Sequence, residues 1–282
     1  MKIGAHVSTA GGLSKAVDRA KDIGAEAIQI FASSPRAWAF KTPSEEEILA
    51  FREKSCEANI SSTFLHASYL VNVGGSPDII EKSVESLSRN MEVANQIGAA
   101  GVIFHGGSHK GVGFSRILDQ AASALRSVLD QSPSDVWLII ENSAGMGAHI
   151  GSSFDEIGAL ISAIDSVRVK VCLDTQHCFA AGYNIVTDQG VHNVMSEFDR
   201  EIGISKLVAV HANDSKKKLG SGVDRHENIG EGYLNEAGFE AIMSHSAFKE
   251  IPFILEVPGF DNNGPDKKNI DRLKNIRSRG GI

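Results

Sequence analysis

The chain has 282 residues, of which 42% are hydrophobic and 22% charged, and 28 Lys and Arg against 35 Asp and Glu give a formal charge of −7. This composition excludes a disordered or fibrous protein. The acidic balance argues against a nucleic-acid-binding module that relies on a basic surface alone.

The sequence carries no signal for export or membrane insertion. Its beginning, MKIGAHVSTAGG, lacks the apolar segment of a signal peptide, and no run approaches the roughly 18 apolar residues of a membrane span. The cysteines, Cys56, Cys172 and Cys178, are scattered and form no CxxC pair, which is typical of a reducing compartment. We therefore expect a cytoplasmic protein with no membrane partner, and Cys172 in its core.

Short apolar runs alternate along the chain with longer amphipathic stretches. The predicted strands are 2–7, 25–31, 62–67, 99–105, 136–141, 169–174, 206–211 and 252–257, and several are apolar throughout, as strands buried on both faces are. Helical spacing of apolar residues predicts helices over 13–24, 79–98, 115–130 and 154–164. Gly24 and Gly98 end the first two.

Eight strands alternating with helices, without a break in composition, predict an α/β protein. We expect residues 1–282 to form a single (β/α)8 TIM barrel, a fold that typically takes about 250 residues. An open doubly wound sheet is the alternative, but the first predicted strand is followed by HVSTAGG instead of the dinucleotide-binding GxGxxG motif.

Residues that can bind metals stand at the ends of six predicted strands. These residues are His66, His105, Glu141, Asp174, His211 and Glu256. In a TIM barrel all six positions lie at the C-terminal rim, where active sites of this fold are built. Unpaired carboxylates and imidazoles are costly to bury, whereas divalent cations such as zinc bind both. The pattern therefore predicts a metal site at this rim.

Three more candidate ligands follow these strand ends. His177 comes three residues after Asp174, and Asp224 and His226 are spaced to face one side of an extended loop. Each of the nine candidate ligands, taken singly, also has an ordinary structural explanation. Asp174, for example, can cap the following helix. Nine ligands in all suit two or three ions that share bridging carboxylates. Ser108 and Ser143 follow no GxSxG elbow, so a serine triad is not expected.

Seven segments resemble, in order and spacing, the endonuclease IV family of apurinic/apyrimidinic endonucleases: MKIGAHVSTAGGL, FLHASYLVNVG, FHGGSHKG, ENSAGMG, VCLDTQHCFAAGYN, HANDSKKKLGSGVDRHENIGEG and ILEVPG. The resemblance covers essentially the whole chain, and the DRHENIGEG and DTQHCFAAGY blocks are highly specific. It implies a TIM barrel with three zinc ions that cleaves DNA on the 5′ side of an abasic site. The products are a 3′-hydroxyl and a 5′-deoxyribose phosphate, and a 3′-end-cleaning phosphodiesterase activity is also expected.

The resemblance also implies the ligand sets. His66, His105 and Glu141 would bind one zinc, Glu141 would bridge to a second zinc completed by Asp174, His211 and Glu256, and His177, Asp224 and His226 would bind the third. Manganese or iron could replace some of the zinc. The chain departs from the family pattern at Gly106, where proline is common, at Met146, where glutamine is usual, and at Gln176, where cysteine is frequent.

Phosphodiester hydrolysis suits such a centre, because metal ions neutralise the phosphate and lower the pKa of bound water towards about 7. We expect two catalytic residues: Glu141, which bridges the ions that hold a hydroxide, and Glu256, which orients that hydroxide. The third ion would stabilise the leaving 3′-oxygen, and bound zinc would offset most of the negative charge of the chain.

The expected partner is duplex DNA that contains an abasic site, bound by a monomer. Lys216, Lys217, Lys218 and Arg225 are candidate phosphate contacts, although a lysine run is ordinarily a solvated loop. The resemblance implies that Arg36, Tyr69 and Leu70 enter the DNA at the lesion; the alternative is that Tyr69 and Leu70 pack the start of a helix.

Two other function classes remain open from the sequence. A metal-dependent sugar isomerase or epimerase also collects His and carboxylate ligands at strand ends of the same barrel, but it needs no third ligand set such as His177, Asp224 and His226. A non-catalytic, metal-dependent DNA-binding module is the other class, and an open three-ion rim is not typical of a closed structural site.

Overall fold

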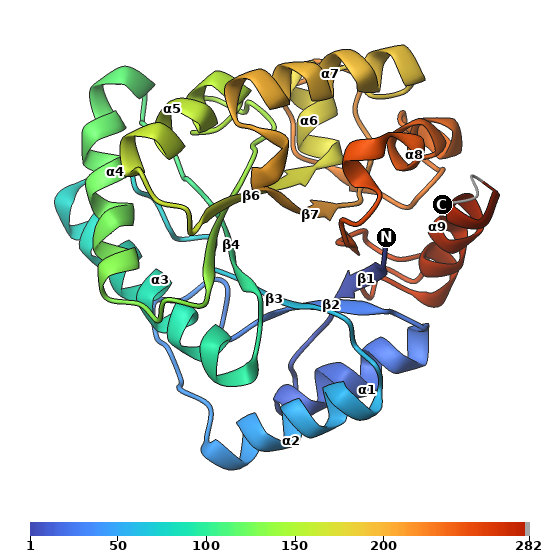
Figure 1. Cartoon of the computed structure of the whole chain (residues 1–282), viewed down its shortest axis with the longest axis horizontal. Helices are drawn as coiled ribbons and strands as arrows, with labels where there is room; N and C mark the ends of the chain where they lie inside the picture. Colours follow the sequence, from blue (N-terminus) through green and yellow to red (C-terminus); the bar gives the residue numbers. More distant parts are fainter. Residues whose placement is uncertain (280–282) are drawn as a thin grey trace.

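A computed structural model describes residues 1–279 and has eight parallel strands that close into a barrel (Figure 1). The strands are β1 (Ile3–His6), β2 (Ala27–Phe31), β3 (Thr63–His66), β4 (Gly101–His105), β5 (Trp137–Glu141), β6 (Val169–Asp174), β7 (Leu207–His211) and β10 (Phe253–Leu255). They follow chain order around the barrel, and β1 pairs with both β2 and β10. The predicted TIM barrel is confirmed, and the open-sheet alternative is wrong.

Helices surround the barrel (Figure 1). They are α1 (Leu13–Ile23), α2 (Glu45–Glu57), α3 (Pro77–Ile97), α4 (Phe114–Asp130), α5 (Phe154–Ile164), α6 (Thr175–Ala181), α7 (Asp188–Glu201), α8 (Asn235–Ser244) and α9 (Lys267–Arg279), with 3-10 turns η1 (Ile204–Lys206) and η2 (Ser246–Phe248). Gly24 and Gly98 adopt the left-handed conformation that ends α1 and α3, as predicted. Among the helices of residues 1–279, none has the length and apolar character needed to cross a membrane.

The side chains of the strands divide between two apolar regions. One region fills the barrel interior and contains Ala27, Phe64, Ile103, Ile139, Cys172, Ala209 and Ile254. The other lies between the strands and the surrounding helices, and Ile28 and Ile30 of β2 belong to it. Because strand side chains alternate between the two, the last polar residues of the strands are placed above the interior layer. Cys172 is a core residue, as expected.

Outside the barrel, an antiparallel hairpin connects β7 with α8. Its strands are β8 (Asp214–Ser215) and β9 (His226–Glu227). Four backbone N–H groups, of Ser215, Gly230, Gly232 and Leu234, donate to the buried carboxylate of Asp214 at 2.7–3.0 Å. These bonds fix the base of the hairpin, from which the 216–225 loop extends.

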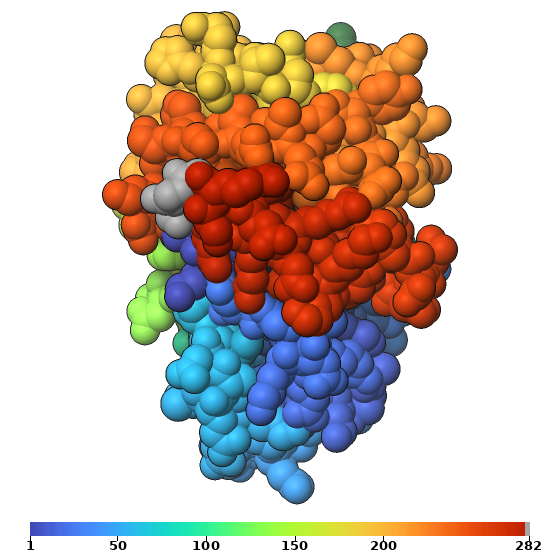
Figure 2. Space-filling view, turned by 90° about the vertical axis from the view of Figure 1, so that its right-hand side faces the viewer, coloured from blue at the N-terminus to red at the C-terminus, as the bar shows by residue number. Residues whose placement is uncertain are grey.

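The two ends of the chain meet at an ion pair. In Figure 2, α9 (red) lies against the N-terminal elements (blue) and α8 (orange). Nη1 and Nη2 of Arg277 donate to the Glu26 carboxylate, at 2.7 and 3.1 Å, and the Ile3 backbone N–H donates to it at 2.9 Å. Burial alone would raise the pKa of Glu26, but the bonds from Arg277 and Ile3 outweigh it and hold this pKa at about 2.

We expect Glu26→Gln to lower the free energy of unfolding by about 1 kcal/mol at neutral pH, because it removes a charge-assisted pair that is partly exposed. Since the pKa of Glu26 is depressed by folding, its contribution is present above its unfolded value near 4.5 and is lost as pH falls through about 2. Denaturant unfolding of the variant and the unsubstituted protein across this pH range checks that the difference in unfolding free energy is present at neutral pH and lost at low pH. The exposed Glu57→Gln is the control, and a deficit that persists unchanged at low pH would contradict the assignment.

Candidate metal centre

The six strand-end residues singled out in the sequence converge at the C-terminal end of the barrel. His66, His105, Glu141, Asp174 and His211 are the final residues of β3, β4, β5, β6 and β7, and Glu256 directly follows β10. The register pairs His105 with Glu141 and Asp174 with His211 across neighbouring strands. Glu141, Asp174 and His211 are fully buried.

Three groups of side chains have the composition and spacing to hold metal ions. Within each group, one ligand atom per residue lies within 4.8 Å of all the others. The groups are His66, His105 and Glu141; Glu141, Asp174, His211 and Glu256; and Asp174, His177 and His226. Glu141 and Asp174 each belong to two groups, so the three potential sites adjoin one another.

Asp224 borders the third group and is more exposed than its members. Its carboxylate oxygens lie 3.3 Å from Nε2 of His177 and 3.3 Å from Nε2 of His226, while 47% of its side chain is exposed. Asp174 joins His177 and His226 in this group, although the sequence placed it only in the second. The hairpin that carries Asp224 and His226 thus brings them to the buried strand ends.

Four of the histidine rings are oriented by a protein oxygen at one ring nitrogen. The pairs are His66 Nδ1 with the Ala67 carbonyl at 2.8 Å, His177 Nδ1 with the Asn142 carbonyl at 3.0 Å, His226 Nδ1 with the Glu256 carbonyl at 3.4 Å, and His211 Nε2 with Oε1 of Gln29 at 2.8 Å. These oxygens only accept hydrogen bonds, so the ring nitrogen facing each carries hydrogen. The other nitrogen presents its lone pair to the carboxylates, as metal-binding histidines do.

The polar atoms at the centre of the cluster are the kind that bind divalent cations. Nitrogens of His66, His105, His177 and His211 lie 2.9–3.5 Å from the buried carboxylate of Glu141. Nε2 of His226 is buried and, within residues 1–279, forms no hydrogen bond, although an oxygen of Asp224 lies 3.3 Å away. Divalent cations held by imidazole and carboxylate ligands remove the cost of burying such groups, so the donor set fits zinc.

Burial and mutual charge shift the pKa values of these groups. Burial lowers the pKa of His105 to about 4, so its imidazole is neutral and able to bind a cation at neutral pH. Burial alone would raise the pKa of Glu141, but the positive charges that His105 and His211 carry when protonated hold it well below its usual range. Burial raises the pKa of Asp174 in spite of nearby histidines. A cation bound here would favour the ionised form of both carboxylates.

Buried amides that the sequence analysis missed hold the ligands in place. Nδ2 of Asn213 donates to Asp174 at 2.7 Å, and its Oδ1 accepts from the Glu256 backbone at 2.9 Å. Oδ1 of Asn142 accepts from the Asp174 backbone at 2.7 Å. Both residues follow a candidate ligand closely in the sequence, and Gln29 interrupts the apolar run AIQIF. The sequence signal that could have identified these three amides is a polar residue inside, or directly after, an apolar strand.

Two departures from the family pattern have a structural explanation. A Cβ at Gly106 would lie 3.0 Å from Cγ2 of Ile150, which fills the space beside this residue. The buried amide of Gln176 donates to the Val223 carbonyl at 3.0 Å and to the hydroxyl of Ser215 at 3.3 Å. Gln176 therefore ties α6 to the hairpin that carries Asp224.

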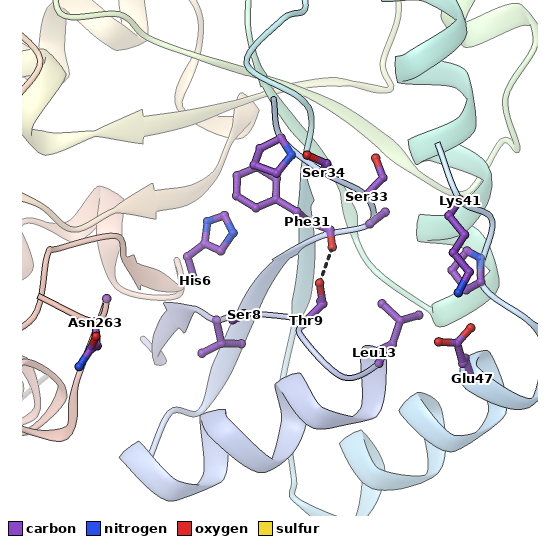
Figure 3. A pocket seen from close by; sticks show the side chains of 16 residues that line it. His6, Ser8, Thr9, Leu13, Phe31, Ser33, Ser34, Lys41, Glu47 and Asn263 are labelled. Atoms are coloured by element: carbon purple, nitrogen blue, oxygen red, sulfur yellow. Dashed lines mark hydrogen bonds between the residues drawn. The ribbon is translucent and has the colours of Figure 1, made fainter. Parts of the chain in front are cut away.

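A cavity of about 420 Å³ opens above the metal groups. Tyr69, His149, Ser143 and Asp224 line it together with His66, His105, His177, His226 and Glu256. A second pocket, of about 600 Å³, lies on the other side of His6 and is shown in Figure 3. The His6 and Phe31 rings, 4.4 Å apart, stand side by side on its wall. His6 also contacts Glu256, at 3.0 Å.

The candidate DNA contacts lie in loops at the same end of the barrel. Tyr69 and Leu70 are 54% and 37% exposed and lie in a turn that precedes α3. The Ser68 hydroxyl and Tyr69 backbone N–H both donate to the Pro35 carbonyl, next to the exposed Arg36. These bonds join the loops that follow β2 and β3.

The basic residues of the hairpin loop are exposed and lie close together. The backbone of Lys216 donates to the Arg225 carbonyl at 3.0 Å, which places the two residues side by side. Lys216 also forms an ion pair with Glu227 at 3.7 Å. Lys217 and Lys218 are exposed beyond this pair. The loop thus presents positive charge next to the cavity.

Comparisons with known proteins identify the family of this chain. The model of the xylose isomerase-like TIM barrel family matches residues 17–276. Probable endonuclease 4 of Halothermothrix orenii is 40% identical over 97% of this chain and 99% of that protein, and probable endonuclease 4 of Natronomonas pharaonis is 38% identical over 98% of each. The crystal structure of endonuclease IV from Thermus thermophilus has a TM-score of 0.86 and 34% identity, covering 99% of this chain and 98% of that one.

A more distant structure resembles the fold alone. A D-tagatose 3-epimerase-like protein has a TM-score of 0.77 but only 20% identity over 100% of this chain and 98% of its own. The identity to the Halothermothrix orenii protein, 40%, is twice as high. The chain is a member of the endonuclease IV family of TIM-barrel enzymes.

Proposed function

We propose that this protein is a DNA-repair endonuclease that hydrolyses the phosphodiester on the 5′ side of an abasic site. The proposal rests above all on one observation: three adjoining groups of histidines and carboxylates share Glu141 and Asp174 beneath an open cavity. Membership of the endonuclease IV family supports the same reaction. The expected products are a 3′-hydroxyl and a 5′-deoxyribose phosphate, and the same chemistry would remove 3′-blocking groups.

Three zinc ions are the cofactor that the donor set fits best. His66 and His105 would hold one ion with Glu141, and His211 and Glu256 would hold another with Glu141 and Asp174. His177 and His226, with Asp174 and Asp224, would hold the third. Bound zinc would neutralise the phosphate charge and make a water molecule more acidic.

The side chains of the chain have distinct tasks in this reaction. Glu256 lines the cavity, so its carboxylate can orient the attacking water. Glu141 lies below and keeps the ligands of two groups in contact through its two oxygens. Water adds to phosphorus, the bond to the upstream 3′-oxygen breaks, and that oxygen leaves as a hydroxyl while the phosphate stays on the abasic sugar.

Selectivity for an abasic site follows from the cost of distorting the duplex. Bringing the scissile phosphate to buried strand ends requires the sugar to leave the stack, which costs least where the base is missing. Tyr69 and Leu70 would fill the space left in the duplex, as inserted side chains do. Arg36 would also enter the DNA at the lesion. The exposed basic residues of the hairpin loop would contact phosphates without reading sequence; they are Lys216, Lys217, Lys218 and Arg225.

Incision of a labelled duplex that carries one abasic site tests the proposed function. We expect a single cut on the 5′ side, a product end that a polymerase extends, and no cut in the matched undamaged duplex. Chelation of the metals should abolish incision. A cut on the 3′ side, or turnover of a ketose with no incision, would overturn the proposal and favour a lyase or a sugar epimerase.

We expect Tyr69→Ala combined with Leu70→Ala to weaken binding to abasic duplex by about 10- to 100-fold, because two exposed side chains that fill the lesion are lost. Binding to undamaged duplex and zinc content should not change. Trp137→Ala is the control, because it removes a large aromatic side chain at the first residue of β5, the end of the strand away from Glu141. Equal weakening on both DNAs in a fluorescence anisotropy titration would assign these residues a structural role.

A further inference from the structure

Gln29 is a polar side chain in a place where the strand is otherwise apolar. It is fully buried in β2, on the side of the strand that faces the barrel interior, as Ala27 does. Its neighbours Ile28 and Ile30 point the other way, into the layer beneath the helices. A buried primary amide is costly unless its oxygen and nitrogen are both hydrogen-bonded.

Both ends of the Gln29 amide contact the metal centre. Nε2 lies 2.6 Å from Oε1 of Glu256 and 2.9 Å from Nδ1 of His6, and Oε1 lies 2.8 Å from Nε2 of His211. A carboxylate only accepts hydrogen bonds, so the amide nitrogen must face Glu256. The amide oxygen is then directed to His211 and accepts its Nε2 hydrogen.

This bond determines which nitrogen of His211 is available to a metal. With hydrogen on Nε2, the lone pair of the neutral ring is on Nδ1. Nδ1 lies 2.9 Å from Glu141 and 3.3 Å from Oε2 of Glu256, inside the second metal group. The same amide holds Oε1 of Glu256 and leaves Oε2 on the side of His211.

We propose that Gln29 is a positioning residue for the metal group formed by Glu141, Asp174, His211 and Glu256. One amide fixes the ring orientation and tautomer of His211 and the carboxylate rotamer of Glu256. The metal in this inference rests on the proposed function, whereas the contacts do not. His6, which contacts both Gln29 and Glu256, lines the neighbouring pocket shown in Figure 3.

No other side chain of similar size can both donate a hydrogen bond to Glu256 and accept one from His211. Methionine has the length of glutamine but neither donates to Glu256 nor accepts from His211. An ionised glutamate would keep an acceptor for His211 but would place a second carboxylate about where Nε2 now lies 2.6 Å from Glu256. Gln29→Met therefore removes the positioning contacts with little change in volume.

Zinc retention by the full-length, zinc-loaded protein tests this assignment. We expect Gln29→Met to release one zinc ion per chain to a chromophoric chelator about 10- to 100-fold more readily, as losses of partners that orient metal ligands typically do. The remaining zinc should be retained as in the unsubstituted protein. On abasic duplex, kcat should fall while KM stays the same, because Gln29 does not line the cavity.

Ile28→Ala is the matched control. It truncates a buried residue of the same strand that faces the helices, so it should lower the melting temperature without changing zinc release. Equal zinc release from Gln29→Met and the unsubstituted protein would overturn the inference, as would increased release from Ile28→Ala by the same factor. If the unsubstituted protein binds zinc but does not cut abasic DNA, the proposed function fails while the altered release from Gln29→Met still supports the positioning role.

Discussion

Glu256→Gln is expected to lower kcat on abasic duplex by about 100- to 10,000-fold while the fold and the affinity for abasic DNA are retained. The side chain lines the cavity, contacts Nδ1 of His211 and accepts hydrogen bonds from Gln29 and His6. A neutral amide of the same shape preserves packing but loses the charge that orients water, and such groups typically contribute this range of rate.

Single-turnover cleavage, with binding measured by anisotropy, checks this expectation. Glu57→Gln is a suitable control because Glu57 is exposed at the end of α2 and belongs to none of the three metal groups. Glu256 has no part in the mechanism if its glutamine variant cleaves at near the original speed. A variant that no longer binds DNA or no longer folds would assign it a structural role.

Glu141→Gln is expected to have the larger effect on metal content. Glu141 belongs to two of the three groups, whereas Glu256 belongs to one. An amide is a poorer zinc ligand than a carboxylate, and here it would be surrounded by nitrogens of His66, His105, His177 and His211. We expect at least one zinc ion to be lost on purification and cleavage to fall below detection.

Elemental analysis of the two variants, purified side by side, makes this comparison. Glu256→Gln should retain more zinc than Glu141→Gln. Retention of the full zinc content by Glu141→Gln would show that this carboxylate bridges no ions, and the shared-ligand arrangement would have to be abandoned.

The barrel could be predicted because its physical signals are local. Each strand is a short apolar run, and Gly24 and Gly98 end their helices in the left-handed conformation that glycine readily adopts. The last strand is shorter than predicted: β10 ends at Leu255, because the Glu256 backbone N–H turns to donate to Asn213 instead of to a neighbouring strand. The ends of elements depend on such tertiary bonds, which no local pattern contains.

The candidate ligands were also identifiable from the sequence, since the end of a parallel strand fixes their place on the rim. The division of these ligands into three metal groups was harder to predict from the sequence. Asp174 joins His177 and His226 because the β8–β9 hairpin folds over α6, and that placement depends on Asp214 and Gln176. The amides of Gln29 and Asn213 had no sequence signal beyond polarity in an apolar setting, because their function lies in contacts with distant strands.

We propose that the three metal groups, which share Glu141 and Asp174, form one hydrolytic centre. Zinc content and incision of abasic duplex, measured on the same purified fraction without added magnesium, test it most directly. We expect close to three zinc ions per chain in protein that cuts on the 5′ side of the lesion. Fully active protein that carries one ion or fewer would contradict it.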